Sequence, residues 1–283
     1  MKTVRIAGVP EHFNLPWHLA MESGEFAAQD LDVQWTDVPE GTGRLCQMLR
    51  EGQADIAVLL TEGIVRDIVL GNPSKIVQVY VQSPLLWGIH VAADSAYKSV
   101  DEVKGKIGAI SRPGSGSQLM AYVLASSMGW PTDDLKFEVV QTIDGAVKAL
   151  TAGEADYFMW ERFMTKPLVD SGVFRRLDDC PTPWPCFVIA ASDEFIAKNP
   201  DALRNLLEVI NKRTSTVKEI EGINEMISTR YGLKPEDVNQ WLSLTEWSQK
   251  VPDVNMLNEV QNQLLSLSLI PKLGTFVEIA KAP

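Results

Sequence analysis

A Gly/Ser-rich loop, SRPGSGS, occupies residues 111–117 and opens a helix-forming segment. Such a loop presents free backbone N–H groups and the positive end of the helix dipole. Ser115, Gly116 and Ser117 form the turn, the two serines add hydroxyl donors, and Arg112 adds a positive charge. No Gly-Lys-Ser/Thr follows, so the loop is not a nucleotide-binding P-loop. It predicts a site for a carboxylate, sulfonate or phosphate, with a capped helix after a flexible turn as the alternative.

Two apolar runs of similar sequence, ADIAVLL and ADYFMW, also deliver residues that could bind a ligand. Thr61 and Glu62 follow the first run, whereas Trp160 and Glu161 stand at the end of the second. Ligands of open α/β sheets bind beyond the carboxyl ends of the strands, and a glutamate is costly to bury without a partner. These observations predict ligand contacts, although Trp160 could pack in the core and Thr61 could cap the next helix.

Further aromatic residues could complete the same site. His12 and Phe13 lie in the loop after the first predicted strand, where no amphipathic pattern explains the phenylalanine. A hydrophobic staple is the alternative explanation for Phe13. Trp87 and Trp184 lie on or near strand-like segments in the middle of the chain, and each could line the site or pack in the core.

The motifs of common catalytic and metal sites are missing from the sequence. It has no Gly-X-Ser-X-Gly or Gly-X-Gly-X-X-Gly, and no Ser or Cys is paired with a histidine by motif. His12 and His18 are six residues apart, which does not give an i,i+4 pair of metal ligands. We therefore expect no catalytic residues, no metal and no cofactor. Cys180 and Cys186 could form a disulfide in an oxidising compartment, but free thiols are favoured.

Composition narrows the class of protein. The chain has 283 residues, 45% hydrophobic, and a formal net charge of −11 without a Lys/Arg cluster. An acidic chain of this kind predicts neither nucleic-acid binding nor attachment to anionic membranes, and no apolar run approaches the roughly 20 residues that span a bilayer. The N-terminal segment does not read as a signal peptide. The sequence as written predicts a cytoplasmic protein, and a periplasmic one if a signal peptide has been removed.

The elements that must position these residues occur in a unit of strand, loop, helix, strand, helix and strand that is found twice. Strands are predicted at residues 3–8, 31–38 and 54–60, and the second copy has them at residues 106–110, 135–141 and 155–160. Strands that alternate with helices favour parallel sheets. The last hundred residues read mostly as helices that are separated by Gly or Pro.

Two lobes are the simplest arrangement of such a repeat. We predict lobe 1 from residues 1–84 and 188–283, and lobe 2 from residues 85–187. Two strand-like segments, at residues 87–93 and 186–191, would link the lobes, and two crossing segments form a hinge.

The opening sequence resembles the start of substrate-binding proteins of the nitrate/sulfonate/taurine and thiamine-precursor type. Ala20, Glu22, Gly24 and Phe26 match the helix of that family, although Asp30 stands in place of a usual glycine. The two GxAD segments resemble paired segments of the same family. The resemblance implies an α/β, two-lobed type II periplasmic-binding-protein-like fold with parallel-rich sheets flanked by helices and two hinge crossings.

The family's ligand positions carry over to the loop around Phe13, to Thr61 and Glu62, to residues 115–117, and to Trp160 and Glu161. The resemblance thus implies a solute-binding protein that captures a small anionic or heteroaromatic ligand between its lobes for ABC-type import. A monomer with an ABC permease as its partner is expected. The alternative is an enzyme of the same fold in thiamine- or menaquinone-precursor synthesis. Yeast-type pyrimidine synthases share this frame but carry a cysteine-rich run, which this chain lacks.

Overall fold

The computed structural model describes residues 1–281, and the chain divides into two compact units. Unit 1 comprises Met1–Ser83 and Trp184–Pro283, and unit 2 comprises Pro84–Pro183. The chain therefore passes from one unit to the other twice. Pro84 belongs to unit 2 and residues 184–187 belong to unit 1, whereas we predicted the reverse. Residues 184–186 precede a strand of unit 1 that begins at Phe187, and the backbone N–H of Cys186 donates to the carbonyl of Ser83.

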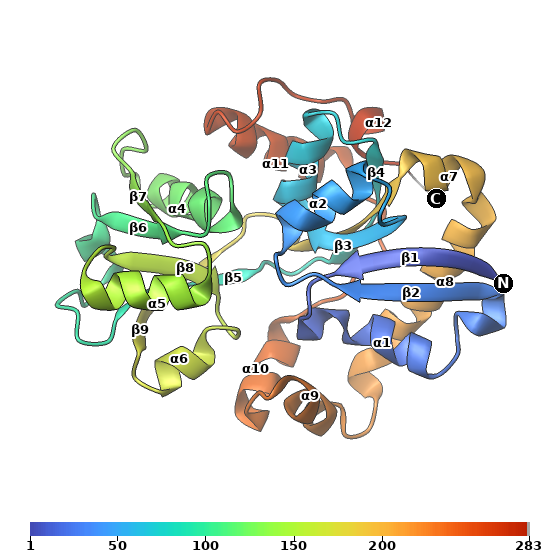
Figure 1. Cartoon of the computed structure of the whole chain (residues 1–283), viewed down its shortest axis with the longest axis horizontal. Coiled ribbons are helices and arrows are strands. Elements are labelled where there is room, and N and C mark those ends of the chain that lie inside the picture. Colours follow the sequence, from blue (N-terminus) through green and yellow to red (C-terminus); the bar gives the residue numbers. More distant parts are fainter. Residues whose placement is uncertain (282–283) are drawn as a thin grey trace. The chain divides into compact units, whose positions relative to one another are not determined.

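Unit 1 is built on a five-stranded mixed sheet, sheet A, in the order β2-β1-β3-β10-β4 (Figure 1). β1 is parallel to β2 and β3, while β10 is antiparallel to β3 and β4. The strands are β1 Lys2–Gly8, β2 Leu31–Asp37, β3 Ile56–Leu60, β4 Ser74–Val81 and β10 Phe187–Ser192.

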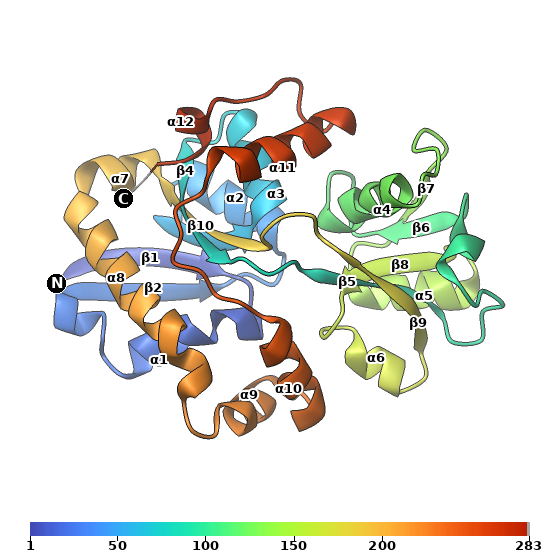
Figure 2. The same cartoon turned by 180° about the vertical axis from the view of Figure 1, so that it is seen from behind.

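Helices cover both faces of sheet A. Helices α2, α3 and α11 lie on one side, and α1, α9 and α10 lie on the other, as both views show (Figures 1 and 2). The helices of this unit are α1 Leu15–Glu22, α2 Thr42–Arg50, α3 Thr61–Val69, α7 Asp193–Lys198, α8 Pro200–Thr216, α9 Ile223–Tyr231, α10 Pro235–Leu244, α11 Val254–Ser266 and α12 Phe276–Ile279. Covered on both faces, β3 is apolar throughout, β10 is apolar up to its last residue, Ser192, and both are almost wholly buried.

Unit 2 repeats this plan around sheet B, which has the strand order β7-β6-β8-β5-β9. β6 is parallel to β7 and β8, and β5 is antiparallel to β8 and β9. Helix α4 lies on one side of the sheet and α5 and α6 on the other (Figures 1 and 2). The elements are β5 Leu86–Ala92, β6 Ile107–Ile110, α4 Gly116–Ser127, β7 Lys136–Val139, α5 Ile143–Ala152, β8 Tyr157–Glu161, α6 Lys166–Asp170 and β9 Phe174–Pro181.

Local sequence explains why the repeated helices end where they do. The side chain of Thr142 accepts a hydrogen bond from the backbone N–H of Gly145 and so caps the start of α5. Gly153 ends that helix in the left-handed conformation, at φ +72°, which glycine adopts without steric cost. This glycine stop, followed by a buried strand, is what the GxAD segments encode.

The sequence did not indicate every element. Antiparallel β5 and β10 make both sheets mixed, where we expected the parallel pairs to dominate. Strand β9 was not predicted because its sequence, FRRLDDCP, is largely charged and only half-buried. The four-residue helix α12 also lacked a clear periodicity. Within the part of the chain that the structure describes, no helix has the length and apolar character to cross a membrane.

Candidate functional site

The carboxyl ends of β1, β3 and β4 meet at one edge of sheet A, and antiparallel β10 begins at that edge. Phe187, the first residue of β10, pairs with Leu60 of β3 and with Val81 of β4. The residues just before β10 therefore lie beside those just after β3. This edge gathers the predicted residues of unit 1, which are His12, Phe13, Thr61 and Glu62.

Thr61 and Glu62 open helix α3 and contact the segment that precedes β10. The hydroxyl of Thr61 donates to the carbonyl of Pro185 at 2.5 Å, and its backbone N–H donates to the carbonyl of Cys186 at 3.1 Å. The indole Nε1 of Trp184 donates to Oε2 of Glu62 at 2.8 Å. Thr61 thus holds the return strand in place, and Glu62 is oriented by a tryptophan far away in sequence.

Glu62 is a buried carboxyl group, and only 3% of its surface is exposed. Burial raises the pKa of Glu62 to about 7, while its own backbone N–H and the Trp184 indole oppose that rise. Its second oxygen, Oε1, is also buried and has no hydrogen-bond partner among residues 1–281. A buried carboxyl oxygen without a donor is an unusual feature that calls for an explanation.

Glu11 is a second carboxyl group at this edge that the sequence analysis missed. It is half-buried in the loop after β1, and burial raises its pKa to about 7. Neither Glu11 nor Glu62 forms an ion pair within the described chain. The sequence offered a signal, since Glu11 immediately precedes two residues that we singled out.

His12 and Phe13 lie in a cluster of rings that unit 1 draws from distant segments. The ring of His12 lies 4.2 Å from that of Trp241 and 5.9 Å from that of Tyr231, and the Phe13 ring lies 5.1 Å from Phe187. Burial lowers the pKa of His12 to about 3, so its imidazole is neutral. The Phe13 carbonyl accepts hydrogen bonds from Tyr80 and Trp247, which fixes this loop.

In unit 2 the predicted Gly/Ser loop follows β6 and caps α4. Ser115 and Ser117 are buried, and their hydroxyl oxygens are 3.0 Å apart. The Ser115 hydroxyl accepts from the Gln118 N–H, and the Ser117 hydroxyl accepts from the Ser111 N–H. Both serines therefore shape the loop, as the capped-helix alternative requires.

The groups of this loop that could still bind a ligand are its free backbone N–H groups and the side chain of Arg112. Among the hydrogen bonds of residues 1–281, none has the backbone N–H of Gly116 or Ser117 as its donor. Arg112 is exposed and makes no ion pair with the described residues. Two free N–H groups at the start of a twelve-residue helix, beside a free guanidinium group, form an electropositive surface.

Trp87, Trp160 and Glu161 lie at the same edge of sheet B as that loop. Antiparallel pairing of β5 with β8 places Trp87 opposite Glu161. The rings of Trp87 and Trp160 are 6.1 Å apart in an edge-to-face contact. Trp87 is buried, whereas half-buried Trp160 packs partly against the core of unit 2 and stacks on Phe158. Unit 2 therefore has a pair of contacting tryptophans at this edge.

Glu161 has a structural role that the sequence did not suggest. Its Oε2 accepts hydrogen bonds from the backbone N–H groups of Phe163 at 2.9 Å and Met164 at 2.7 Å. The carboxylate thereby caps the turn after β8. Glu161 ends β8 and Glu62 lies in the first turn of the helix after β3, and their carboxyl groups are held in different ways.

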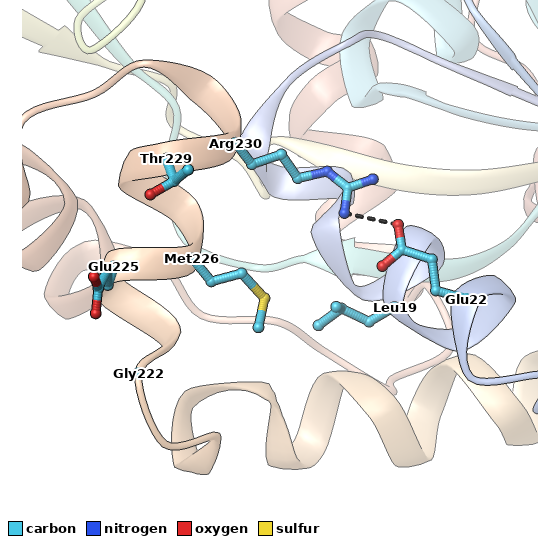
Figure 3. A pocket seen from close by; sticks show the side chains of 7 residues that line it. All are labelled: Leu19, Glu22, Gly222, Glu225, Met226, Thr229 and Arg230. Carbon is cyan, nitrogen blue, oxygen red and sulfur yellow. Dashed lines mark ion pairs between the residues drawn. The ribbon is translucent and has the colours of Figure 1, made fainter.

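Two surface pockets of unit 1 lie away from these residues. One, of about 530 Å³, lies between α1 and α9 and is bordered by an ion pair of 2.8 Å between Glu22 and Arg230 (Figure 3). The other, of about 630 Å³, includes Arg5 and Asp55, which form an ion pair of 2.6 Å. Neither pocket contains a predicted site residue, so both are separate from the candidate site.

No cluster of three or more His, Cys, Asp or Glu side chains within residues 1–281 could hold a metal ion. Cys46, Cys180 and Cys186 are free and buried. His90, the third histidine, is buried, with Nε2 2.9 Å from the Thr165 hydroxyl and Nδ1 3.3 Å from the Phe158 carbonyl. His90 therefore belongs to the core of unit 2.

Comparison with known proteins gives the fold its name. Residues 87–180 match the model of the Ca3427-like PBP family. The whole chain is similar to the Candida albicans CA3427 gene product, which is described as defining a new family with the generic periplasmic binding protein fold. The two are 28% identical with a TM-score of 0.91, over 99% of this chain and 96% of that one. The chain has the periplasmic-binding-protein fold.

Two other structures with the periplasmic-binding-protein fold are similar at lower identity. The alkanesulfonate-binding protein SsuA of Xanthomonas axonopodis pv. citri, bound to MOPS, is 17% identical with a TM-score of 0.80, covering 96% of this chain and 95% of that one. The nitrate-binding protein NrtA of Synechocystis PCC 6803 is also 17% identical, with a TM-score of 0.69, covering 96% and 83%. A search of the curated proteins found no match. The resemblance and the fold class predicted from the sequence are confirmed.

Proposed function

We propose that this protein is a solute-binding protein that captures a small organic ligand, anionic or heteroaromatic, between its two units. The observation that carries the proposal is the matched arrangement of the two sheets. Each unit brings polar and aromatic residues to the edge where its parallel strands end, which is where ligands of open α/β sheets bind.

The chemistry of the two edges supports this choice of ligand. The free N–H groups of Gly116 and Ser117, together with Arg112, suit an anionic group. The tryptophan pair and the phenylalanine and histidine of the first loop suit a flat ring. A ligand that contacts both units favours their closed arrangement, because only that arrangement makes both sets of contacts.

An ABC permease is the proposed partner, since solute-binding proteins deliver ligands to such permeases. Support comes from the similarity of the chain to the sulfonate-binding and nitrate-binding proteins named above. We propose that the protein acts as a monomer, because one chain contains both units.

Thermal-shift screening of the purified protein tests the proposal. The panel comprises sulfonates, nitrate, phosphates and pyrimidines, and we expect at least one sulfonate or pyrimidine to raise the melting temperature. A ligand at 100 times its Kd stabilises the folded state by about 2.7 kcal/mol, which such a screen detects. If pyrimidines and sulfonates both leave the melting temperature unchanged, the proposed ligand class is wrong.

An enzyme of the same fold in thiamine- or menaquinone-precursor synthesis is the second candidate. Glu62 favours it, because a buried carboxyl with a pKa of about 7 has the property of a general acid or base. Incubation of the protein with each bound compound, followed by mass spectrometry, separates the two candidates. Consumption of the ligand supports the enzyme, and recovery of unchanged ligand supports the binding protein.

A further inference from the structure

The two oxygens of the Glu62 carboxyl, at the edge of sheet A, differ in their hydrogen bonding. Oε2 accepts from Trp184 at 2.8 Å, which fixes the plane and orientation of the group. Oε1 is buried and lacks a hydrogen-bond partner within the described residues. Leaving a buried acceptor unsatisfied costs about 1–3 kcal/mol, and more for a charged group. A group that donates a hydrogen bond to Oε1 recovers that free energy.

The charges around this edge indicate what kind of group that is. Glu11 also lies here, and neither it nor Glu62 is paired with a cation of the described chain. At pH 8, where both carboxyl groups are ionised, a bare oxyanion such as nitrate or a simple sulfonate has only acceptor atoms and would meet two negative charges. An ammonium group or an amino-heteroaromatic N–H meets acceptors instead, and a hydrogen bond to a charged acceptor is worth about 1.5–3 kcal/mol.

We propose that the ligand carries an N–H donor, on an ammonium or amino-heteroaromatic group, which binds Oε1 of Glu62. This inference rests on the proposed solute-binding function and narrows its substrate class. If the ligand is zwitterionic, its anionic end binds the electropositive loop of unit 2. The ligand is therefore zwitterionic or amino-heteroaromatic, and Glu62 is the residue that selects the donor end.

The hydrogen bond from Trp184 makes Glu62→Gln a specific test, because it fixes which way the glutamine amide must point. The indole donates to one side of the carboxyl, so a glutamine must place its amide oxygen there. Its NH2 group then occupies the position of Oε1 and meets the N–H of the ligand, donor against donor. Because glutamine has nearly the same shape as glutamate, the fold is preserved. Glu194→Gln is the matched control, because Glu194 is exposed on α7 and, among residues 1–281, its one ion pair is with Lys198.

Isothermal titration at pH 8, where the Glu62 carboxyl is ionised, with matched compounds tests the inference. The pairs are 2-aminoethanesulfonate with ethanesulfonate, and 4-aminopyrimidine with pyrimidine, which differ only in the amino group. We expect the amino member of at least one pair to bind more tightly than its partner. We also expect Glu62→Gln to weaken that binding about 10- to 100-fold, whereas Glu194→Gln leaves it unchanged.

The outcomes distinguish a failure of the donor inference from a failure of the proposed solute-binding function. If ethanesulfonate or pyrimidine binds as tightly as its amino partner, and Glu62→Gln changes neither, the donor inference is overturned while the solute-binding function stands. If amino compounds bind and Glu62→Gln leaves their affinity intact, Glu62 is not the selecting residue and the inference also fails. If none of the compounds binds in either this test or the wider screen, both proposals fall.

Discussion

The indole Nε1 of Trp184 donates a hydrogen bond of 2.8 Å to Oε2 of Glu62, although 122 positions separate the two residues. Antiparallel β10 brings them together, since the residues before it lie beside the end of β3. This bond is the one side-chain donor found for the Glu62 carboxyl within residues 1–281. It therefore orients the group, and it opposes the burial that raises the pKa of Glu62.

Trp184→Phe removes this donor and should destabilise unit 1. The free energy of unfolding is expected to fall by about 1–3 kcal/mol at pH 8, where the carboxyl is ionised. The loss should be smaller at pH 5.5, where the carboxyl is protonated. Urea denaturation followed by circular dichroism at both pH values measures it. Trp241→Phe is the control, because the buried Nε1 of Trp241 has no hydrogen-bond partner among the described residues; an equal pH-dependent loss in the control would contradict the explanation.

The raised pKa of Glu62 makes stability depend on pH. Folding moves this pKa from the ordinary 4.5 up to about 7, so between these values the folded state holds a proton that the unfolded state has lost. The contribution of Glu62 to stability is thus present below pH 4.5 and is lost as pH rises to about 7. Relative to Glu62→Gln, the native protein should lose up to about 1.4 kcal/mol per pH unit in that window. A stability difference that stays flat from pH 4.5 to 7 would show that burial does not shift this group.

Ser117→Ala should destabilise unit 2 whether or not a ligand binds there. The Ser117 hydroxyl accepts the Ser111 N–H at 3.0 Å in a buried position. Leaving that donor unsatisfied is expected to cost about 1–3 kcal/mol, measured by urea denaturation. Ser126→Ala, an exposed position on the same helix, should have little effect. Equal stability of the two variants would mean that the loop does not depend on this bond.

Arg112→Gln should separate binding from stability. Arg112 is exposed and forms no ion pair with other described residues, so its replacement should leave the melting temperature unchanged. The affinity for an anionic ligand should fall, and the dependence of that affinity on salt should weaken. Titrations at two salt concentrations measure both effects. Unaltered affinity and salt dependence would remove Arg112 from the site.

Gly88→Ala should disturb the core of unit 2. A Cβ at Gly88 would lie 2.5 Å from Cε1 of His90, a ring held by Thr165 and Phe158. The ring cannot move without breaking a buried hydrogen bond, so we expect a loss of about 1–3 kcal/mol. Gly24→Ala tests the specificity of this clash, since a Cβ at Gly24 meets no atom within 4 Å and suffers only from its left-handed φ.

Much of the fold could be predicted because its signals are local. Buried strands such as β3 and β8 read as continuous apolar runs, and α5 has both a threonine cap and a glycine stop. The direction of β10 could not be predicted, because a fully buried strand has the same pattern in either orientation. Strand β9 was missed because its adjacent charged residues interrupt the alternation of apolar and polar residues that indicates a strand.

The sequence predicted which residues lie at the ends of the strands, but it predicted the contacts of their side chains less well. The rule that ligands bind beyond strand ends located Thr61, Glu62 and the loop that contains Ser117. The contact of Glu62 with Trp184, and the packing of His12 against Trp241, join segments that only the folded chain brings together. Glu161 shows that the similarity between the two GxAD segments does not extend to the role of their glutamates. Each copy carries a glutamate close to the end of its buried strand, but one carboxylate caps a turn and the other has a free oxygen.

The pairing of Phe187 with Val81 has a consequence for synthesis of the chain. These residues are neighbours in sheet A, and all of unit 2 is translated between them. Until β10 leaves the ribosome, β3 and β4 lack the strand that joins them, while unit 2 already has all of its residues. We expect unit 2 to fold first during translation. Until β10 is synthesised, the N-terminal part of unit 1 stays incompletely folded, and chaperones can bind it.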